Sequence, residues 1–351
     1  MGAHRINSMF RVIRLDVMLI AIIVSLSLPS PIQPPASGQT VVPNAPFKIV
    51  VLPDTQHYAQ HFPWLLKLQT DWVASVSQSQ NIVFVTQTGD IVENWDNQTQ
   101  WRAADTAFTS LDGHIPYGIA PGNHDIAPDG TSPFFHQYFP LERLRNPETA
   151  RFGFDQAAVA PFGSHGSNNT YRLFSAAGKQ FIGINLEFCP ADDTVTWLDQ
   201  TLTKFAQYGA IITTHSFTSA SGDRETASHS CQVWAGPGQN AATDIWDKVI
   251  APGQHDNVLM FLSGHDIWSS AGAARRTDIV NGYPLHQMLS NYQEFKLGGE
   301  AYLRLLEFDI DKSVLNVSTY SPLTKTFKTD ADNQFSLYIP FSKRFDVPTK
   351  Q

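Results

Sequence analysis

The chain has 351 residues, of which 42% are hydrophobic and 16% are charged, and its formal net charge is −8. This composition supplies enough apolar surface for a folded core and excludes an intrinsically disordered protein. The length suits one large domain or two small ones. The negative net charge argues against a protein that binds nucleic acid through bulk electrostatic attraction.

The first 38 residues are predicted to be a signal peptide, followed by a single domain over 39–351. Three arginines precede an apolar stretch at 17–28, and residues 36–38 have the small-x-small pattern of a cleavage site. The apolar stretch is short for a membrane span, although an uncleaved anchor is the alternative. In either case we expect the folded part to be secreted or periplasmic, with no other membrane contact.

The chain contains two cysteines, Cys189 and Cys231. They lack the close spacing of a zinc site, and an even pair in an oxidising compartment is more often a disulfide. We therefore expect these two residues to be disulfide-bonded.

Short apolar runs alternate with helical patterns along the chain, which predicts strands and helices in turn. The first half gives a strand at 47–52, a helix at 62–76, a strand at 82–85, a helix at 101–111 and a strand at 115–119. The second half gives a strand at 179–186, a helix at 195–205, strands at 210–214 and 258–263, and a hairpin of strands at 302–309 and 314–320. Such alternation implies parallel strands joined by crossover helices. We expect an α/β fold in which two mixed β-sheets pack face to face as a sandwich, with helices on the outer faces.

Nearly every predicted strand ends in a polar cluster. These clusters contain Asp54, Asp90, Asn123, His215 and His265. Because ligands bind beyond the carboxyl ends of strands in open α/β sheets, we expect these side chains to be directed at one region. Each motif alone is weak, since a Gly-Asp pair suits a tight turn and a lone histidine is usually structural. Their order and their shared position at strand ends make the set informative.

The whole series resembles the motifs of the calcineurin-like metallophosphoesterase superfamily. It reads Asp54-x-Gln56, Gly89-Asp90, Gly122-Asn123-His124-Asp125, Thr214-His215 and Gly264-His265. The resemblance extends over most of the mature chain, and it implies a four-layer β-sandwich flanked by helices. It also implies a site for two divalent cations, commonly manganese, iron or zinc.

Six residues would be metal ligands in this resemblance. They are Asp54 and Gln56 at the first cation, Asn123, His215 and His265 at the second, and Asp90 bridging both. Two cations about 3.5–4 Å apart can clamp the attacking and leaving oxygens of an in-line displacement. They also lower the pKa of a bound water to about 7, which supplies hydroxide as the nucleophile.

Two further residues are implied to act in the chemistry and not as ligands. His124 is similar to the superfamily's catalytic histidine, which supplies a proton or stabilises the leaving alkoxide. Asp125 would orient the ring of His124 through a hydrogen bond.

The sequence departs from the superfamily pattern at the first cation. The last motif is usually Gly-His-x-His, but here it ends in Ile267, and Gln56 stands where histidine is commoner. The first metal site is therefore expected to be the weaker one. His57 or Asp266 could compensate, although His57 is better interpreted as part of the rim of the site.

Other candidate residues give weaker signals. Trp95 and Trp101 could line a substrate groove, but core packing is the commoner reason for such residues. Arg275 and Arg276 could contact phosphate, and a surface loop explains them equally well.

The leading hypothesis is metal-dependent hydrolysis of a phosphomonoester or phosphodiester substrate by a metal-activated hydroxide. The alternatives are a non-catalytic metal-binding protein derived from this fold, and a one-metal hydrolase of another ester. The identity of the substrate, the metal and the oligomeric state stay open at this point.

Overall fold

The computed structural model describes residues 45–145, 159–161, 166–231 and 239–344. The chain divides into two units, and the first, Met1–Val41, lies outside the described residues and contains the whole of the predicted signal peptide. The second unit, Val42–Gln351, contains every element described below. No helix in the described ranges is long and apolar enough to cross a bilayer.

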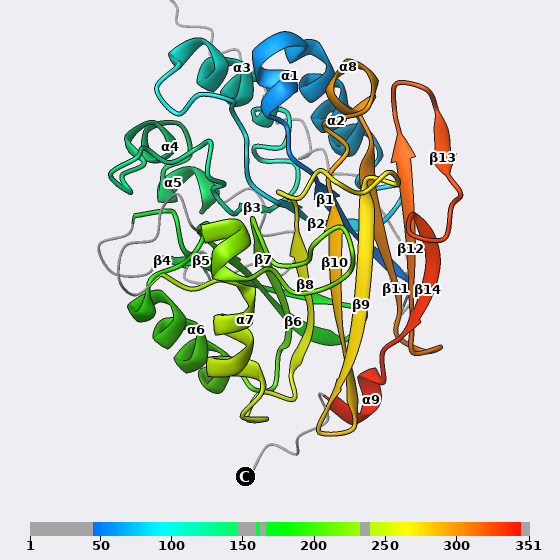
Figure 1. Ribbon diagram of the computed structural model, residues 1–351. Coiled ribbons are helices and arrows are strands. Elements are labelled where there is room, and N and C mark those ends of the chain that lie inside the picture. Colours follow the sequence, from blue (N-terminus) through cyan, green and yellow to red (C-terminus); the bar gives the residue numbers. More distant parts are fainter. Residues whose placement is uncertain (1–44, 146–158, 162–165, 232–238, 345–351) are drawn as a thin grey trace, which may run out of the picture. The chain divides into compact units, whose positions relative to one another are not determined.

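One mixed sheet is built from strands at the two ends of this unit (Figure 1). Its strands are β1 (Phe47–Leu52), β2 (Ile82–Gln87), β3 (Tyr117–Ile119), β11 (Leu303–Asp309), β12 (Val314–Ser321), β13 (Thr326–Lys328) and β14 (Gln334–Tyr338). Their order is β13-β12-β11-β1-β2-β3, with β14 also paired to β12. Strands β1, β2 and β3 run parallel, and the other neighbours are antiparallel.

The second mixed sheet comes from the middle of the chain. Its strands are β4 (Val159–Pro161), β5 (Thr170–Ala176), β6 (Lys179–Leu186), β7 (Gly209–Thr214), β8 (Val258–Ser263), β9 (Ala273–Val280) and β10 (Tyr283–Ser290). Their order is β4-β5-β6-β7-β8-β10-β9, and β6, β7, β8 and β10 are parallel. The carboxyl ends of these parallel strands therefore meet at one edge of the sheet.

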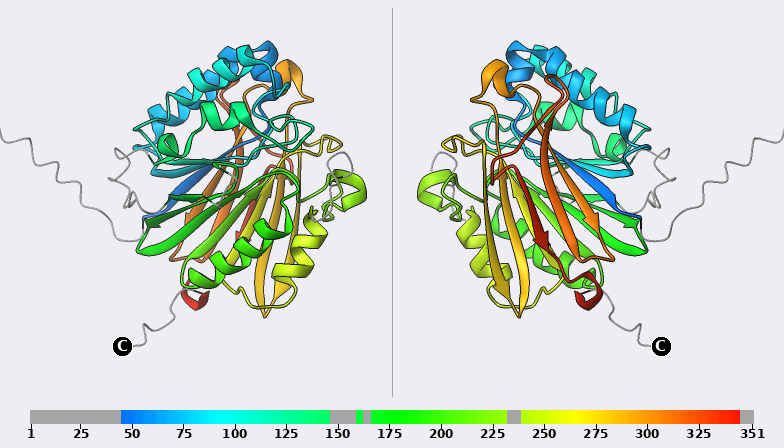
Figure 2. Two further views of the ribbon diagram at one scale, coloured as in Figure 1. Left: turned by 90° about the vertical axis from the view of Figure 1, so that its left-hand side faces the viewer. Right: turned by 90° about the vertical axis from the view of Figure 1, so that its right-hand side faces the viewer.

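The two sheets pack face to face, with helices on both outer faces (Figure 2). The longer helices are α2 (Pro63–Val76), α3 (Gln98–Phe108) and α6 (Asp192–Lys204). Shorter ones are α1 (Gln56–His61), α4 (Pro133–Tyr138), α5 (Leu141–Leu144), α7 (Ala242–Ile245), α8 (Lys296–Gly299) and α9 (Phe341–Arg344), with π-helical turns at Ala227–Cys231 and Trp246–Ile250. The expected α/β sandwich with helices outside is confirmed.

Three apolar clusters fill the spaces between these layers. The central cluster joins the inner faces of the two sheets and includes Phe47, Phe84 and Phe181. A second cluster packs α2 and α3 on the first sheet, and Trp101 lies fully buried within it. The third packs α6 and α7 on the second sheet. Trp101 is therefore a core residue, as the commoner interpretation of its position predicts.

A small polar network crosses the interface between the sheets just below the strand ends. The Asn185 amide of β6 donates to the Thr86 hydroxyl of β2 at 3.0 Å, and Thr86 donates to the Thr213 hydroxyl of β7 at 2.8 Å. All three residues are buried, so each hydrogen bond replaces one to water. The network fixes how the first sheet lies on the second.

Gly118 on β3 has no side chain because the Asn185 amide occupies that space. A β-carbon at Gly118 would lie 2.0 Å from Oδ1 of Asn185. We expect Gly118→Ala to lower the free energy of unfolding by about 1–3 kcal/mol through overpacking. Urea unfolding of the unreduced protein measures this change. In an Asn185→Ala background the same substitution should have a smaller effect, and an equal effect in both backgrounds would contradict the assignment.

Candidate metal centre

Polar side chains follow the carboxyl ends of strands from both sheets. Asp54 comes after β1, Asp90 after β2 and Asn123 after β3 in the first sheet. His215 and His265 follow β7 and β8 in the second sheet. The side chains of these five residues are joined into one cluster by contacts across the two sheets.

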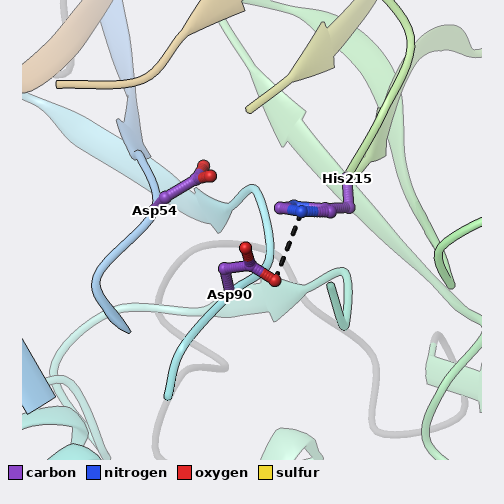
Figure 3. Close-up of side chains that lie close together, drawn as sticks. All are labelled: Asp54, Asp90 and His215. Carbon is purple, nitrogen blue, oxygen red and sulfur yellow. Dashed lines mark ion pairs between the residues drawn. The ribbon is translucent and has the colours of Figure 1, made fainter. Parts of the chain in front are cut away.

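Asp54, Asp90 and His215 form the centre of this cluster. Each offers one ligand atom, and these three atoms lie within 4.8 Å of one another. The three side chains are directed at one another from separate strand ends (Figure 3), and all are buried. Such a group of buried carboxylates and imidazole is the donor set of a metal site.

Three other ligand atoms surround Nε2 of His215. Oδ1 of Asn123 lies 3.0 Å from this nitrogen, and Oδ1 of Asp90 and Nδ1 of His265 each lie 3.2 Å from it. The other ring nitrogen, Nδ1 of His215, donates to the Thr88 carbonyl at 2.9 Å. In the neutral ring this contact leaves Nε2 unprotonated, which is the tautomer that ligates a metal.

Asp54 is held by three donors that fix both of its oxygens. Oδ1 accepts from the Thr88 hydroxyl at 3.2 Å, and Oδ2 accepts from the backbone N–H of His265 at 2.9 Å. Oδ2 also accepts from the Asn291 amide at 2.9 Å. These contacts orient the carboxylate before any cation is bound.

The electrostatics of the cluster reflect burial and mutual contact. Burial, and the charge of Asp90 beside it, raise the pKa of Asp54 to about 7. Burial alone would lower the pKa of His215, but its ion pair with Asp90 outweighs that effect and raises the pKa to about 9. The same pair holds the pKa of Asp90 well below its usual range. Burial, with the charge of His215 nearby, lowers the pKa of His265 to about 4.

Gln56 supplies the clearest sign that the cluster fits a cation. Its Oε1 is buried and has no hydrogen-bond partner among the described residues. A buried amide oxygen without a partner is unfavourable unless something else satisfies it. Gln56 lies two residues beyond Asp54 in the chain, and amide, carboxylate and imidazole donors are of the kinds that suit manganese, iron or zinc.

Glycines let the ligands approach the backbone closely. A β-carbon at Gly264 would lie 1.8 Å from Oδ1 of Asp54, and one at Gly122 would lie 2.2 Å from Oδ1 of Asp90. At Gly89, whose φ is +104°, a β-carbon would lie 2.5 Å from Nδ1 of His215. The Gly-x pairs of the motifs are therefore required by packing against the ligands.

The structure corrects the role predicted for Asp125. Its carboxylate accepts backbone N–H groups of Ile91, Val92 and Gly122 at 2.8–3.1 Å, and burial raises its pKa to about 7. The ring of His124 instead donates from Nδ1 to the Glu93 carbonyl at 2.8 Å. Asp125 therefore ties the loop after β2 to the loop after β3 through these backbone donors.

Both residues suggested as replacement ligands have partners outside the Asp54–Asp90–His215 cluster. The Asp266 carboxylate accepts the backbone N–H groups of Ala220 at 2.7 Å and Trp268 at 2.9 Å. His57 contacts the Gln293 carbonyl through Nδ1 at 3.2 Å, and its Nε2 lies 3.9 Å from Glu93. Asp266 fastens two loops together, and His57 lies at the rim of the site.

Arg275 and Arg276 lie in strand β9 and not in the expected loop. Arg276 pairs with Asp278, and Arg275 lies over the ring of Phe335. The contacts with Asp278 and Phe335 explain the positions of these two arginines without a phosphate ligand.

Sequence reasoning missed Asn291 and Glu93. Asn291 follows the end of β10 and contacts Asp54, so the strand-end signal that revealed the other residues applies to it as well. Glu93 has its carboxylate 3.8 Å from Nδ1 of His124, and its Oε2 has no hydrogen-bond partner within the described part of the chain. No sequence pattern marks Glu93, because its role depends on the loop geometry.

The chain has a curated relative in Bacillus subtilis (strain 168), the uncharacterized protein YvnB. The two are 32% identical over 314 residues, which is 85% of this chain and 22% of the relative. The chain thus spans about a fifth of the length of that protein. No family model matches the sequence.

Solved structures with a similar fold have 10–12% sequence identity to this chain. A purple acid phosphatase from yellow lupin seeds has a TM-score of 0.49, and the match covers 84% of this chain and 54% of that one. GAP50 of Plasmodium, described as the anchor in the inner membrane complex, has a TM-score of 0.46, with 84% and 89% covered. A predicted phosphoesterase from Streptococcus pneumoniae has a TM-score of 0.34, with 84% and 99% covered.

The contact between Asn291 and Asp54 leads to a test of the site. Asn291→Ala removes the donor to Oδ2 of Asp54, and loss of such a supporting hydrogen bond lowers metal affinity by about 10–100-fold. Titration of manganese into metal-free protein measures the change. Asn316→Ala, which removes an amide on β12 bonded to Glu307, is the matched control and should leave affinity unchanged. Equal affinity in both variants would show that Asn291 does not support the site.

Proposed function

We propose that this chain is a metal-dependent phosphoester hydrolase of the calcineurin-like metallophosphoesterase type. The observation that carries the proposal is the convergence of Asp54, Asp90 and His215 from separate strands, with ligand atoms within 4.8 Å of one another. The motif series quoted from the sequence supports the same assignment. Burial of such a cluster has no structural advantage by itself, because two carboxylates repel each other in a low-dielectric interior.

The ligands divide between the two sheets. Asp54 and Gln56 of the first sheet would hold the first cation, and His215 and His265 of the second sheet would hold the other. Asp90 would contact both cations. Asn123, which follows β3 of the first sheet, would be the remaining ligand of the second cation. When bound, two divalent cations would polarise the phosphoester and activate a water molecule for attack on phosphorus.

His124 has the geometry of a residue that acts on the substrate. Its backbone N–H donates to Oδ1 of Asp90 at 3.0 Å, which places it beside the proposed bridging ligand. Its Nδ1 is engaged with the Glu93 carbonyl, so Nε2 is the ring nitrogen left to meet the substrate. A proton held on Nε2 can pass to the leaving oxygen as the phosphorus–oxygen bond breaks. We assign the orientation of this ring to Glu93 in place of Asp125.

We also propose that the protein acts outside the cytosol. Cys189 and Cys231 form a disulfide, with their Cα atoms 5.8 Å apart, as expected from the sequence. A disulfide persists in oxidising compartments and is rare in the cytosol. The signal peptide at 1–38 remains a prediction, and sequencing of the N-terminus of the exported protein would test it.

A second candidate is a protein that binds one cation, either without catalysis or as a hydrolase of another ester. The observation in its favour is Ile267, which offers no donor atom where the superfamily has an imidazole. Gln56 contributes a neutral oxygen to the same site. This candidate predicts full function with one ion, which the metal titration below would detect.

Two substitutions separate metal binding from chemistry. Asp90→Asn should abolish hydrolysis of p-nitrophenyl phosphate and lower metal content, because one charge serves both cations. His124→Ala should lose turnover with near-normal metal content, because its backbone N–H still donates to Asp90. Steady-state kinetics and elemental analysis of the same preparations give both quantities.

His61→Ala is the control, since His61 is exposed at the end of α1 and makes none of these contacts. It should retain activity and metal. Normal turnover in Asp90→Asn would refute the two-metal assignment, and loss of metal from His124→Ala would make His124 a ligand.

The two metal sites should differ in affinity. The first lacks an imidazole at Ile267 and has an amide at Gln56, and each weakened ligand should reduce affinity by at least about 10–100-fold. Protein purified without added metal should hold about one ion per chain, and activity should rise as the second is supplied. Ile267→His should tighten the first site in a calorimetric titration. Two equally tight ions in the wild type would mean that another residue completes it.

A further inference from the structure

A cavity of about 480 Å³ lies between the loop that follows β7 and the loop that follows β8. Its walls include Asp266, which directly follows the proposed ligand His265, and Ser219 and Ser221 of the loop that follows His215. The cavity wall and the proposed second metal site are therefore adjacent in the chain, at residues 266 and 265. A group attached to a phosphorus atom at that site would extend into this cavity.

The carboxylate of Asp266 links the two walls of the cavity. Asp266 accepts the backbone N–H of Ala220 through one oxygen and that of Trp268 through the other. Asp266 is buried, so this bridge fixes the loop after β7 against the loop after β8. The two walls therefore have a set separation before a ligand arrives, which reduces the entropy lost on binding.

Two flat side chains provide the binding surface. The indole of Trp268 is 79% exposed, although it lines the cavity. The guanidinium of Arg224, in the loop after β7, lies 3.3 Å over the ring of Trp246. This stacking contact fixes the orientation of the guanidinium plane. Exposed indole rings and guanidinium planes are the groups on which nucleobases stack.

The remaining wall groups disfavour other ligands. The charge of Arg224 is paired with Asp278, and Asp266 adds a negative charge, so the cavity does not attract a second phosphate. The hydroxyls of Ser219 and Ser221 are bonded to each other at 2.9 Å, and those of Thr226 and Ser228 at 3.0 Å. These contacts use part of the hydrogen-bonding capacity of the hydroxyls, and one indole cannot cover an acyl chain.

We propose that this cavity binds the nucleobase of a nucleoside phosphoester, with Trp268 as the stacking platform. This inference rests on the proposed function, and it names the substrate class. In the reaction, water adds to phosphorus, the bond from phosphorus to the nucleoside 5′ oxygen breaks, and that oxygen leaves with a proton. The base remains on Trp268 while the phosphorus is at the metal centre.

Binding without catalysis is the first test. Adenosine and ribose are titrated into metal-free protein, and binding is followed by saturation-transfer NMR. Adenosine should bind the wild type, ribose should not, and Trp268→Ala should weaken adenosine binding by about 5–100-fold. Trp268→Phe keeps a ring and should retain most of the binding. Trp64→Ala, at another exposed tryptophan on α2, is the matched control.

Absence of adenosine binding, or equal binding by the wild type and Trp268→Ala, would overturn the proposal. Because the ligand is uncharged and no metal is present, this result does not depend on hydrolysis. If the protein binds adenosine but hydrolyses no phosphoester, then the proposed function fails and the nucleobase site stands.

Kinetics with manganese provide the second test. AMP and ribose 5-phosphate have the same primary alkoxide leaving group and differ in the base. Trp268→Ala should lower kcat/KM for AMP by about 5–100-fold and leave the value for ribose 5-phosphate unchanged. An equal loss for both substrates would show that Trp268 shapes the metal centre and does not recognise the base.

Discussion

The burial of two carboxylates beside each other is the constraint on which the rest of the site depends. Asp54 and Asp90 are both almost fully buried, and desolvation penalises each charge. The imidazolium of His215 offsets one negative charge, which explains its raised pKa and leaves Asp54 the carboxylate with the higher pKa. A cation bound between these carboxylates would compensate both negative charges.

This constraint explains why small residues and backbone amides surround the ligands. Asp90 has a φ of 51°, a conformation that is unfavourable for a residue with a side chain. Two sets of hydrogen bonds stabilise this conformation. The Asp125 carboxylate accepts from the backbone N–H groups of Ile91 and Val92, and the Asp90 carbonyl accepts from the backbone N–H of Thr55 at 2.9 Å. The loops after β1, β2 and β3 are thus connected to one another, which is how three separate strands can present their ligands with one geometry.

The sequence predicted the strands that are continuous apolar runs and missed strands in which polar residues interrupt that pattern, such as β10. Strands 47–52, 179–186 and 258–263 were predicted with their observed bounds, because continuous apolar runs mark strands covered on both sides. Strand β10 was missed because His286 and Gln287 are buried in pairs with β9 residues, which interrupts the apolar pattern. Asn291 was missed with it. The partner of His124 is a backbone carbonyl, which side-chain identities do not reveal.

The division of ligands between the sheets links the site to the stability of the sandwich. Ligands from the first sheet face ligands from the second across the same interface that Thr86, Asn185 and Thr213 bridge below. A shift of one sheet relative to the other would break this network and separate Asp90 from His215, which are 3.2 Å apart. Cations bound at the carboxyl ends of the strands would hold the two sheets together, because their proposed ligands come from both sheets. The inter-sheet hydrogen bonds and the contacts of the buried Asp–Asp–His cluster therefore enforce the same alignment, so the geometry of this cluster depends on how the layers pack.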